Sequence, residues 1–350
     1  MRDGTAGFTF GALALRPGGS GVQTYIRELL RYMPELLAPA PTTALVQADA
    51  VGELPAGMHA ITRPVADGAR RAVYGAAPLR TSVFHGLDVD LPLTGPAATV
   101  ATVHDLSVID MPSASNRFRA AGENVLVRRV LRKADVLIAV SRFTADRIKD
   151  IAGRDAHVVE LAPAVWATPP SEADIERVRA AHHLPEQFVL QVGTVEPRKN
   201  VTLVAEAAER LGIPCVLAGG GSQGPDAPAS AIGLGYVDVE DLPALYGAAT
   251  VTAYASYYEG YGLPPVEAMA CGGAVVASAV GALPEVVGNG ARLVAADDVD
   301  DWVAAMEPLV RDRSARDELT RAAITTMEPI TWERTARATV DVYRREGISP

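Results

Sequence analysis

The sequence predicts an α/β protein with two doubly wound parallel sheets, one in each half of the chain. Short apolar runs alternate with longer amphipathic segments from end to end, as expected of parallel strands joined by crossover helices. The length of 350 residues suits two domains. A stretch rich in proline and small residues at 162–170, APAVWATPP, separates the two series. We therefore expect domains at 1–165 and 170–330, with a helix in 331–350 packing back onto the first domain.

The first domain is predicted to open on a buried strand, Phe8–Leu15, which a glycine-rich loop joins to a helix, Val22–Tyr32. Further apolar runs predict the other strands of this domain: Thr43–Gln47, Ser82–His85, Thr99–Val103, Val136–Val140 and Val158–Leu161. The other clear helices are Asn116–Lys133 and Thr144–Lys149, and Ser141 is placed to cap the second.

The second domain repeats this rhythm after a charged helix at 171–183, SEADIERVRAAHH. Its predicted strands are Phe188–Val192, Cys215–Leu217, Val251–Tyr254, Val275–Ala277 and Ala291–Val294. Its predicted helices are Val201–Leu211, Leu242–Ala248, Val266–Ala270 and Asp298–Val310. The segment TWERTARATVDVYRRE at 331–346 reads as a final amphipathic helix with no strand behind it.

Composition excludes several classes of protein. A hydrophobic share of 49% with 21% charged residues excludes disorder as the main state. The net charge of −10 disfavours a nucleic-acid partner, so any phosphate must be bound by a local basic cluster. Two cysteines, Cys215 and Cys271, form neither a zinc cage nor a disulfide framework. No apolar run reaches the roughly 18 residues of a transmembrane segment, and we expect a cytoplasmic protein. The sequence leaves the oligomeric state open.

The stretch from Ser256 to Cys271, SYYEGYGLPPVEAMAC, is the richest in candidate chemistry. A loop after a predicted strand leads into a helix with prolines in its first turn, where unpaired N–H groups and the helix dipole favour an anion. Glu259 precedes the helix, and Glu267 is expected in its first turn. Ionised carboxylates only accept hydrogen bonds, which suits vicinal hydroxyls of a sugar or ribose. The alternative is an ordinary helix whose acids complement its dipole.

A basic pair, Arg198 and Lys199, follows another predicted strand in GTVEPRKN. The C-terminal ends of parallel strands gather at one edge of a sheet, where ligands of such folds bind. Two cations there would neutralise a diphosphate. The alternative is a solvated basic pair on a loop.

Two further candidates lie in the first domain. The loop RPGGSG at 16–21 follows the first strand, and its glycines, Gly19 among them, permit a close backbone approach to a phosphate or an acceptor. His104 and Asp105 end the strand run TVHD, with His104 as a candidate for chemistry and Asp105 as a cap or orienting partner. A packed histidine and a simple glycine turn are the alternatives.

Two motif matches are read as decoys. The Asp88-Val89-Asp90 triplet fits a metal-binding DxD pattern, but so short a match is common by chance, and no metal is predicted. Residues 219–224, GGGSQG, satisfy GxGxxG after a strand, but Pro225 and Pro228 argue against the helix that a dinucleotide site requires. Val237 lies in IGLGYVDVEDL, where backbone groups could meet a nucleotide base or a buried strand could explain the pattern.

With these residues in hand, the chain resembles the retaining glycosyltransferases of family 4. Glu259 and Glu267 in EGYGLPPVEAMACGGAVVAS are similar to the family's Glu-x7-Glu signature. The segments PGGSGVQTYIREL, TVHDLSVIDMP, ADVLIAVSRFTADRI, LQVGTVEPRKN and TWERTARATVDVY match in the same order. The resemblance implies the GT-B fold, in which two Rossmann-like domains face a cleft and the C-terminal helix crosses back to the first domain.

The resemblance also implies roles for the candidate residues. Lys199 would hold the diphosphate of a nucleotide-sugar donor, with Arg198 supplying the charge that many members place where this chain has Thr194. Glu259 would bind the sugar hydroxyls, Glu267 the ribose, and His104 would lie near the donor hexose. The remaining donor-binding residues expected are Gly19, the backbone of Gly260, Tyr261, Gly262 and Leu263, and Val237.

We thus expect a metal-independent enzyme with no cofactor that transfers a hexose, with retention at the anomeric carbon, from a GDP-mannose or UDP/GDP-glucose type donor to an acceptor hydroxyl. Two alternatives stay open: a non-catalytic nucleotide-sugar-binding protein and an NAD-dependent oxidoreductase of the Rossmann type. The sequence does not identify the donor base, the hexose or the acceptor.

Overall fold

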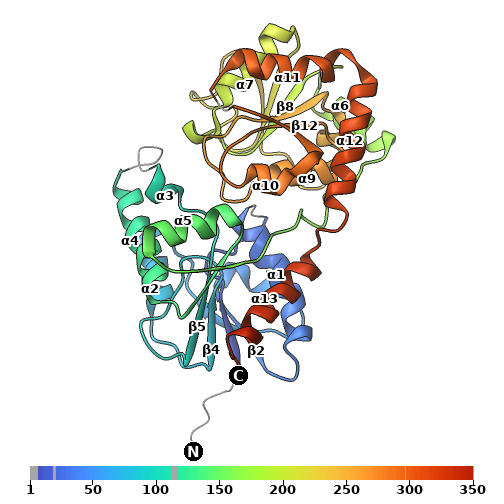
Figure 1. Ribbon diagram of the computed structural model, residues 1–350. Coiled ribbons are helices and arrows are strands. Elements are labelled where there is room, and N and C mark those ends of the chain that lie inside the picture. The colour runs from blue at the N-terminus through green and yellow to red at the C-terminus, as the bar shows by residue number, and fades with distance from the viewer. Residues whose placement is uncertain (1–6, 19–20, 112–116, 296, 350) are drawn as a thin grey trace, which may run out of the picture. The chain divides into compact units, whose positions relative to one another are not determined.

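Residues 7–18, 21–111, 117–295 and 297–349 are described by the computed structural model, and within them seven parallel strands form the sheet of a first unit, residues 1–161 with 331–350 (Figure 1). The strand order is β3-β2-β1-β4-β5-β6-β7. The strands are β1 Phe8–Gly11, β2 Thr42–Gln47, β3 His59–Arg63, β4 Val83–Gly86, β5 Ala98–Val103, β6 Val136–Ala139 and β7 His157–Val158. The order reverses between β1 and β4, which are hydrogen-bonded neighbours with Phe8 opposite Val83.

Helices cover both faces of this sheet. They are α1 Val22–Leu36, α2 Gly68–Ala76, α3 Ser107–Asp110, α4 Arg117–Lys133, α5 Arg142–Ala152 and α13 Trp332–Arg345, with a 3-10 turn η1 at Ala48–Glu53. Helix α13 packs against α1. On the opposite face, Val130 and Leu131 of α4 and Ile148 of α5 join Phe84 and Leu137 of the sheet in one buried cluster. The amphipathic segment after residue 330 thus completes the first unit.

The second unit, residues 162–330, has six parallel strands in the part of it that the structure describes, in the order β10-β9-β8-β11-β12-β13. The strands are β8 Val189–Val192, β9 Cys215–Ala218, β10 Ala231–Gly235, β11 Val251–Tyr254, β12 Val275–Ser278 and β13 Ala291–Val294. The helices are α6 Glu172–Ala181, α7 Val201–Leu211, α8 Leu242–Ala248, α9 Leu263–Ala270, α10 Leu283–Val287, α11 Val299–Arg311 and α12 Arg313–Met327, with 3-10 turns η3 Pro197–Lys199 and η4 Gly288–Gly290.

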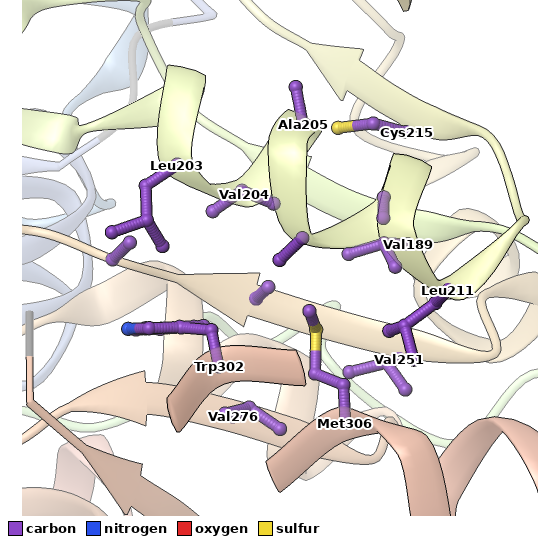
Figure 2. Close-up of a cluster of buried hydrophobic side chains, with 14 of the residues drawn as sticks. Val189, Leu203, Val204, Ala205, Leu211, Cys215, Val251, Val276, Trp302 and Met306 are labelled. Carbon is purple, nitrogen blue, oxygen red and sulfur yellow. The ribbon is translucent and has the colours of Figure 1, made fainter. Parts of the chain in front are cut away.

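The core of the second unit lies between the sheet and the helices α7 and α11 (Figure 2). Leu203 and Val204 of α7 lie in one cluster with Trp302 and Met306 of α11, and all of these side chains are buried. The Trp302 indole N–H donates to the Ala295 carbonyl at 2.7 Å, so its one polar atom is satisfied. This packing holds the strands whose C-terminal ends carry the site.

Side-chain caps begin several helices where the sequence changes from loop to helix. The predicted cap on α5 is confirmed, because the Ser141 hydroxyl accepts a hydrogen bond from the Thr144 amide at 3.1 Å. Ser171, Asp298, Asp312 and Thr331 cap α6, α11, α12 and α13 in the same way. Short polar residues ahead of amphipathic runs therefore define where these helices start.

The two-sheet prediction is confirmed, but its details need correction. The edge strands β3 and β10 were not predicted, because both are half exposed and β10 carries Gly233 and Gly235, which weaken a strand pattern. The first strand ends at Gly11 rather than Leu15, since the buried residues after it form a turn. The last strand of the first unit is only His157–Val158. Helices α2 and α12 were also missed.

No helix in the described part of the chain is long and apolar enough to cross a membrane.

Candidate active site

The candidate residues of the second unit follow two strands that are neighbours in its sheet. Strand β8 pairs in parallel with β11, with Val251 opposite Val189. The chain passes from β8 outward to β9 and β10 and then returns to the other side of β8 as β11. Such a reversal leaves a crevice at the C-terminal ends of the strands, and this is where open α/β sheets bind ligands. The loops after β8 and β11 carry the basic pair and Glu259.

Lys199 and Glu259 form the centre of the site. Lys199 Nζ donates to Glu259 Oε1 at 2.5 Å, although the two residues are 60 positions apart in the chain. The same carboxylate oxygen accepts a hydrogen bond from the Ser256 hydroxyl at 2.7 Å. A lysine ammonium has three donors, so two remain for another anion.

Arg198 connects the loop after β8 to the loop after β11 by hydrogen bonds. Its Nη1 donates to the Tyr258 carbonyl at 2.7 Å and to Glu259 Oε2 at 3.3 Å, while its own carbonyl accepts from the Tyr257 amide at 2.9 Å. Nη2 lies 3.6 Å from a carboxylate oxygen of Glu196. The structure thus brings together Arg198, Lys199 and Glu259, as the sequence suggested, and makes Arg198 a bridge between loops as well as a charge.

Glu259 is 7% exposed and ionised. Burial by itself raises the pKa of its carboxyl, but the adjacent charges of Lys199 and Arg198, with hydrogen bonds from Lys199 and Ser256, hold the pKa below its ordinary value. A carboxylate offers about four lone-pair sites, and three are used here. The remaining one can accept a hydrogen bond from a hydroxyl group of a bound molecule.

The loop after β12 supports Glu259 from the other side, and sequence reasoning missed it. The Ala282 amide donates to the Glu259 carbonyl at 2.9 Å. Gly281 has φ +58°, and a Cβ there would lie 2.3 Å from the same carbonyl oxygen. Only glycine therefore fits. Gly281 stands shortly before a Leu-Pro pair in GALPEV, as Gly262 does in GLPPV. This similarity was the sequence signal that could have identified the loop.

Helix α9 starts at Leu263, three residues before the predicted start, so Glu267 lies in its second turn and not in the first. The reason is Gly262, whose φ of +99° turns the chain into the helix, together with Pro264 and Pro265, whose fixed φ suits a first turn. The two prolines also remove two of the amide donors that a helix N-terminus normally presents. Of the first three residues of α9, Leu263 is the one with a backbone N–H group. The N–H of Val266, the fourth residue, donates to the Gly262 carbonyl at 3.4 Å.

Glu267 is buried at 9% exposure, and within the described residues it has no ion-pair partner. Burial raises the pKa of its carboxyl to about 7. The carboxyl pKa values of the two glutamates of this loop and helix therefore shift in opposite directions: cations lower that of Glu259, and burial raises that of Glu267.

The other donor-side candidates lie around this centre in less specific ways. Gly260 and Tyr261 continue the loop after Glu259, and Tyr261 is 5% exposed. Val237 follows the edge strand β10 and is half-buried, which differs from the buried-strand alternative. Residues 219–230, all of them described, form turns without a helix, so the GxGxxG match lacks the context of a dinucleotide site.

His104 belongs to the first unit and follows β5. Its Nε2 donates to the Leu87 carbonyl at 2.9 Å, so the neutral ring has its lone pair on Nδ1. Burial lowers the pKa of His104, and the Leu87 bond and the carboxylates of Asp88 and Asp105 only partly oppose this. Asp105 Oδ1 accepts hydrogen bonds from the Ser107 amide and hydroxyl at 3.0 and 2.8 Å, but the N-cap position of α3 is Leu106 and not Asp105. Gly19 lies outside the described residues.

A cavity of about 1170 Å³ in the first unit includes His104 in its wall. Valine and leucine side chains of α4 line much of it, and its described wall contains more carboxylates than cations. Both acids of the DxD match lie here, and each has a protein partner: Asp88 pairs with Arg71, and buried Asp90 accepts from the Leu13 amide at 3.1 Å. These contacts agree with a structural loop. Among the described residues, no group of three or more His, Cys, Asp or Glu side chains gathers as a metal site.

Two family models match the chain. The model for Glycosyltransferase Family 4 matches residues 19–163, and the model for Glycosyl transferases group 1 matches residues 173–326. The O-antigen chain mannosyltransferase B of Escherichia coli is 30% identical over 295 residues, which cover 79% of this chain and 77% of that protein.

Solved structures show the same fold at low sequence identity. A sucrose-phosphate synthase from Thermosynechococcus elongatus matches with a TM-score of 0.77 at 20% identity, over 97% of this chain and 98% of that one. Anabaena HepE, solved in complex with UDP and glucose, matches with a TM-score of 0.73 at 17% identity, over 97% and 99%. These likenesses assign the GT-B fold.

Proposed function

Because the chain belongs to glycosyltransferase family 4, we propose that it is a retaining hexosyltransferase, which transfers a hexose from a nucleotide diphosphate sugar to an acceptor hydroxyl without a metal ion. The observation that carries the proposal is the Lys199–Glu259–Arg198 cluster at the strand-order reversal of the second unit. It places two cations and one ionised acceptor group where such sheets bind ligands.

The cations suit the diphosphate of the donor. Lys199 keeps two donors beyond its bond to Glu259, and Arg198 directs its guanidinium at the same carboxylate. As the bond between the anomeric carbon and the phosphate oxygen breaks, negative charge grows on the diphosphate. Preorganised positive groups stabilise that charge without reorganising, which is the main source of rate enhancement in such sites.

The amide donors at α9 play a smaller part than a full helix N-terminus would. Pro264 and Pro265 leave Gly262 and Leu263 as the backbone donors ahead of Val266. We therefore assign most of the diphosphate binding to Lys199 and Arg198. This division makes the side chains, rather than the helix dipole, the sensitive part of the site.

Glu259 is proposed to orient the hexose and not to attack it. Lys199, Ser256 and Arg198 already occupy both carboxylate oxygens, which lowers the nucleophilicity of the group. This supports a same-face substitution: the acceptor oxygen bonds to the anomeric carbon, the phosphate oxygen leaves on the same face, and the acceptor proton passes to that oxygen. Glu267 is proposed to hold the ribose, and Val237 to lie near the base.

The first unit is proposed to contribute His104 beside the hexose and the cavity next to it for the acceptor. The cavity volume of about 1170 Å³ somewhat exceeds the roughly 300 to 1,000 Å³ of small-molecule sites. The donor is proposed to be of the GDP-mannose or UDP/GDP-glucose type. The relative from E. coli is a mannosyltransferase, and HepE was solved with UDP and glucose.

The test is a donor panel with the purified chain. GDP-mannose, GDP-glucose and UDP-glucose are each incubated with and without EDTA and with candidate acceptors, and nucleoside diphosphate release is measured together with product mass. NMR of the product gives the anomeric configuration. Release unaffected by EDTA with a retained α-linkage is the expected result. Inversion would overturn the mechanism, and binding of a donor without turnover for any acceptor would favour the non-catalytic alternative.

A further inference from the structure

A second buried histidine, His85 on β4, takes no part in the proposed chemistry. It is fully buried, and both ring nitrogens are engaged: Nε2 lies 2.8 Å from the Thr102 hydroxyl, and Nδ1 lies 2.6 Å from the Tyr343 hydroxyl of α13. Thr102 in turn lies 2.8 Å from the hydroxyl of Tyr25 on α1. Tyr25, Thr102, His85 and Tyr343 thus form one polar chain, called here the Tyr25–Tyr343 chain, in which every side chain is at most 2% exposed.

The Tyr25–Tyr343 chain reaches His104 through an aromatic contact. The rings of Tyr25 and His104 lie edge to face, with centroids 4.7 Å apart and planes at 74°. His104 has one hydrogen bond, from Nε2 to Leu87, and its Nδ1 bonds to none of the residues that the structure describes. A single hydrogen bond fixes one ring atom but not the plane of the ring. The edge-to-face contact with Tyr25 adds a second constraint, which acts on that plane.

The residues of the Tyr25–Tyr343 chain are uncharged and held in place by their hydrogen bonds. Burial, with a smaller contribution from the neighbouring His104, lowers the pKa of His85 to about 3, so the ring carries one hydrogen. The single ring hydrogen then lies on one of the two nitrogens: either His85 Nε2 donates to Thr102 and Tyr343 donates to Nδ1, or Thr102 donates to Nε2 and Nδ1 donates to Tyr343. Removing any hydroxyl leaves a buried polar atom without its partner, which is costly.

We propose that Tyr25 is a positioning residue for His104, and that the Thr102–His85–Tyr343 contacts fix Tyr25 by tying it to the sheet and to α13. Tyr25 does not touch substrate. It presents the Nδ1 side of the His104 ring in one orientation, and helix α13 contributes to that orientation from 239 residues further along the chain, through Tyr343. The effect of Tyr25 on catalysis rests on the proposed function, in which His104 lies beside the hexose. The orienting of the His104 ring by Tyr25 does not rest on it.

A double-mutant cycle tests the proposal. Tyr25→Phe keeps the ring and removes the hydroxyl, and we expect it to lower kcat/KM for nucleoside diphosphate release about tenfold, mainly through kcat. In a His104→Ala background the same substitution should cost less than about twofold, because there is no ring left to orient. Tyr32→Phe, on the same helix α1 but outside the chain of contacts, is the matched control and should leave the rate unchanged. An equal cost of Tyr25→Phe in both backgrounds would show that Tyr25 acts only through the general stability of the unit.

An NMR titration separates this proposal from the proposed function. The chain has six histidines, and a His104→Gln variant assigns the His104 resonance in the ¹⁵N-histidine-labelled protein. Tyr25→Phe and Tyr343→Phe should move the midpoint of His104 toward the ordinary histidine value. An unchanged His104 titration in both variants overturns the positioning role even if the enzyme transfers sugar. A moved titration with no transfer by the wild type overturns the function and leaves the positioning intact.

Discussion

Lys199 Nζ and Glu259 Oε1 lie 2.5 Å apart, yet they belong to loops that follow different strands of the second sheet. The pair exists because β8 and β11 are neighbours at the reversal of strand order, where the chain has passed through β9 and β10 in between. Lys199 helps to keep the buried Glu259 carboxyl ionised. The pair is also the simplest target for mutation.

Lys199→Ala should lower kcat/KM for transfer by more than about tenfold. The substitution removes a charged contact to the donor diphosphate, worth roughly 1.5 to 3 kcal/mol, and leaves Arg198 as the single cation beside Glu259. Steady-state rates with the best donor of the panel measure the effect. Lys149→Ala is the matched control, because that lysine pairs with Asp155 at the surface. Equal rates for both variants would exclude Lys199 from donor binding.

Glu259→Gln should change how stability responds to acid. The folded pKa of Glu259 is depressed, so its contribution to stability is complete above its ordinary value of 4.5 and is lost as the pH falls through the lower folded value. The difference in Tm between wild type and Glu259→Gln, measured between pH 3 and 7, should therefore shrink below about pH 4.5. A difference that is constant with pH would contradict the ion-pair assignment.

Glu267→Gln should show the opposite dependence. The folded pKa of Glu267 is raised to about 7, so the folded state binds the proton more tightly than the unfolded state, and wild-type stability falls as the pH rises from 4.5 to 7. The glutamine variant lacks this loss. Urea unfolding at pH 5 and pH 8 should show its relative stability rising by on the order of 2 to 3 kcal/mol. No rise would mean that the carboxyl titrates as if it were exposed.

Gly262→Ala should destabilise the fold and lower the rate together. The residue has φ +99°, and an added Cβ would lie 2.5 Å from a methyl carbon of Leu283. The left-handed backbone and the clash together cost roughly 2 to 4 kcal/mol. Gly52→Ala is the control, since a Cβ there meets nothing within 4 Å and the backbone is not strained. Thermal melts of both variants decide the matter, and equal melting temperatures would contradict the required conformation.

Strands with two buried faces were predictable from the sequence. Among the edge strands, β13 was predicted with the bounds it has, Ala291–Val294, whereas β3 and β10 were missed. The four residues of β11 are all buried, and a strand buried on both faces is recognisable in the sequence as a short, mainly apolar run. The five residues of β10 are all at least partly exposed, and two of them are glycine. The exposed residues and glycines of β10 weaken its apolar pattern, so local sequence does not distinguish this strand from a loop.

The same contrast applies to the candidate site. Arg198, Lys199 and Glu259 are chemically distinctive, and their positions after predicted strands were enough to bring them together. Ser256 and Gly281 act on Glu259 through a short hydroxyl contact and through the lack of a Cβ, neither of which local sequence signals. His85 was read only as part of a strand, because its partners Thr102 and Tyr343 are distant in sequence and meet it only through the topology.

Helix α13 makes the order of synthesis and the order of completion of the first unit different. Residues 1–161 leave the ribosome first, but α13 arrives only with residues 331–350. This helix carries Tyr343, whose hydroxyl bonds to His85 and whose ring stacks on Phe8 at 5.3 Å. The second unit has all of its strands by then and can fold as a unit while the first waits. A nascent chain stopped at residue 330 should therefore be protease-resistant in its second half and sensitive in its first.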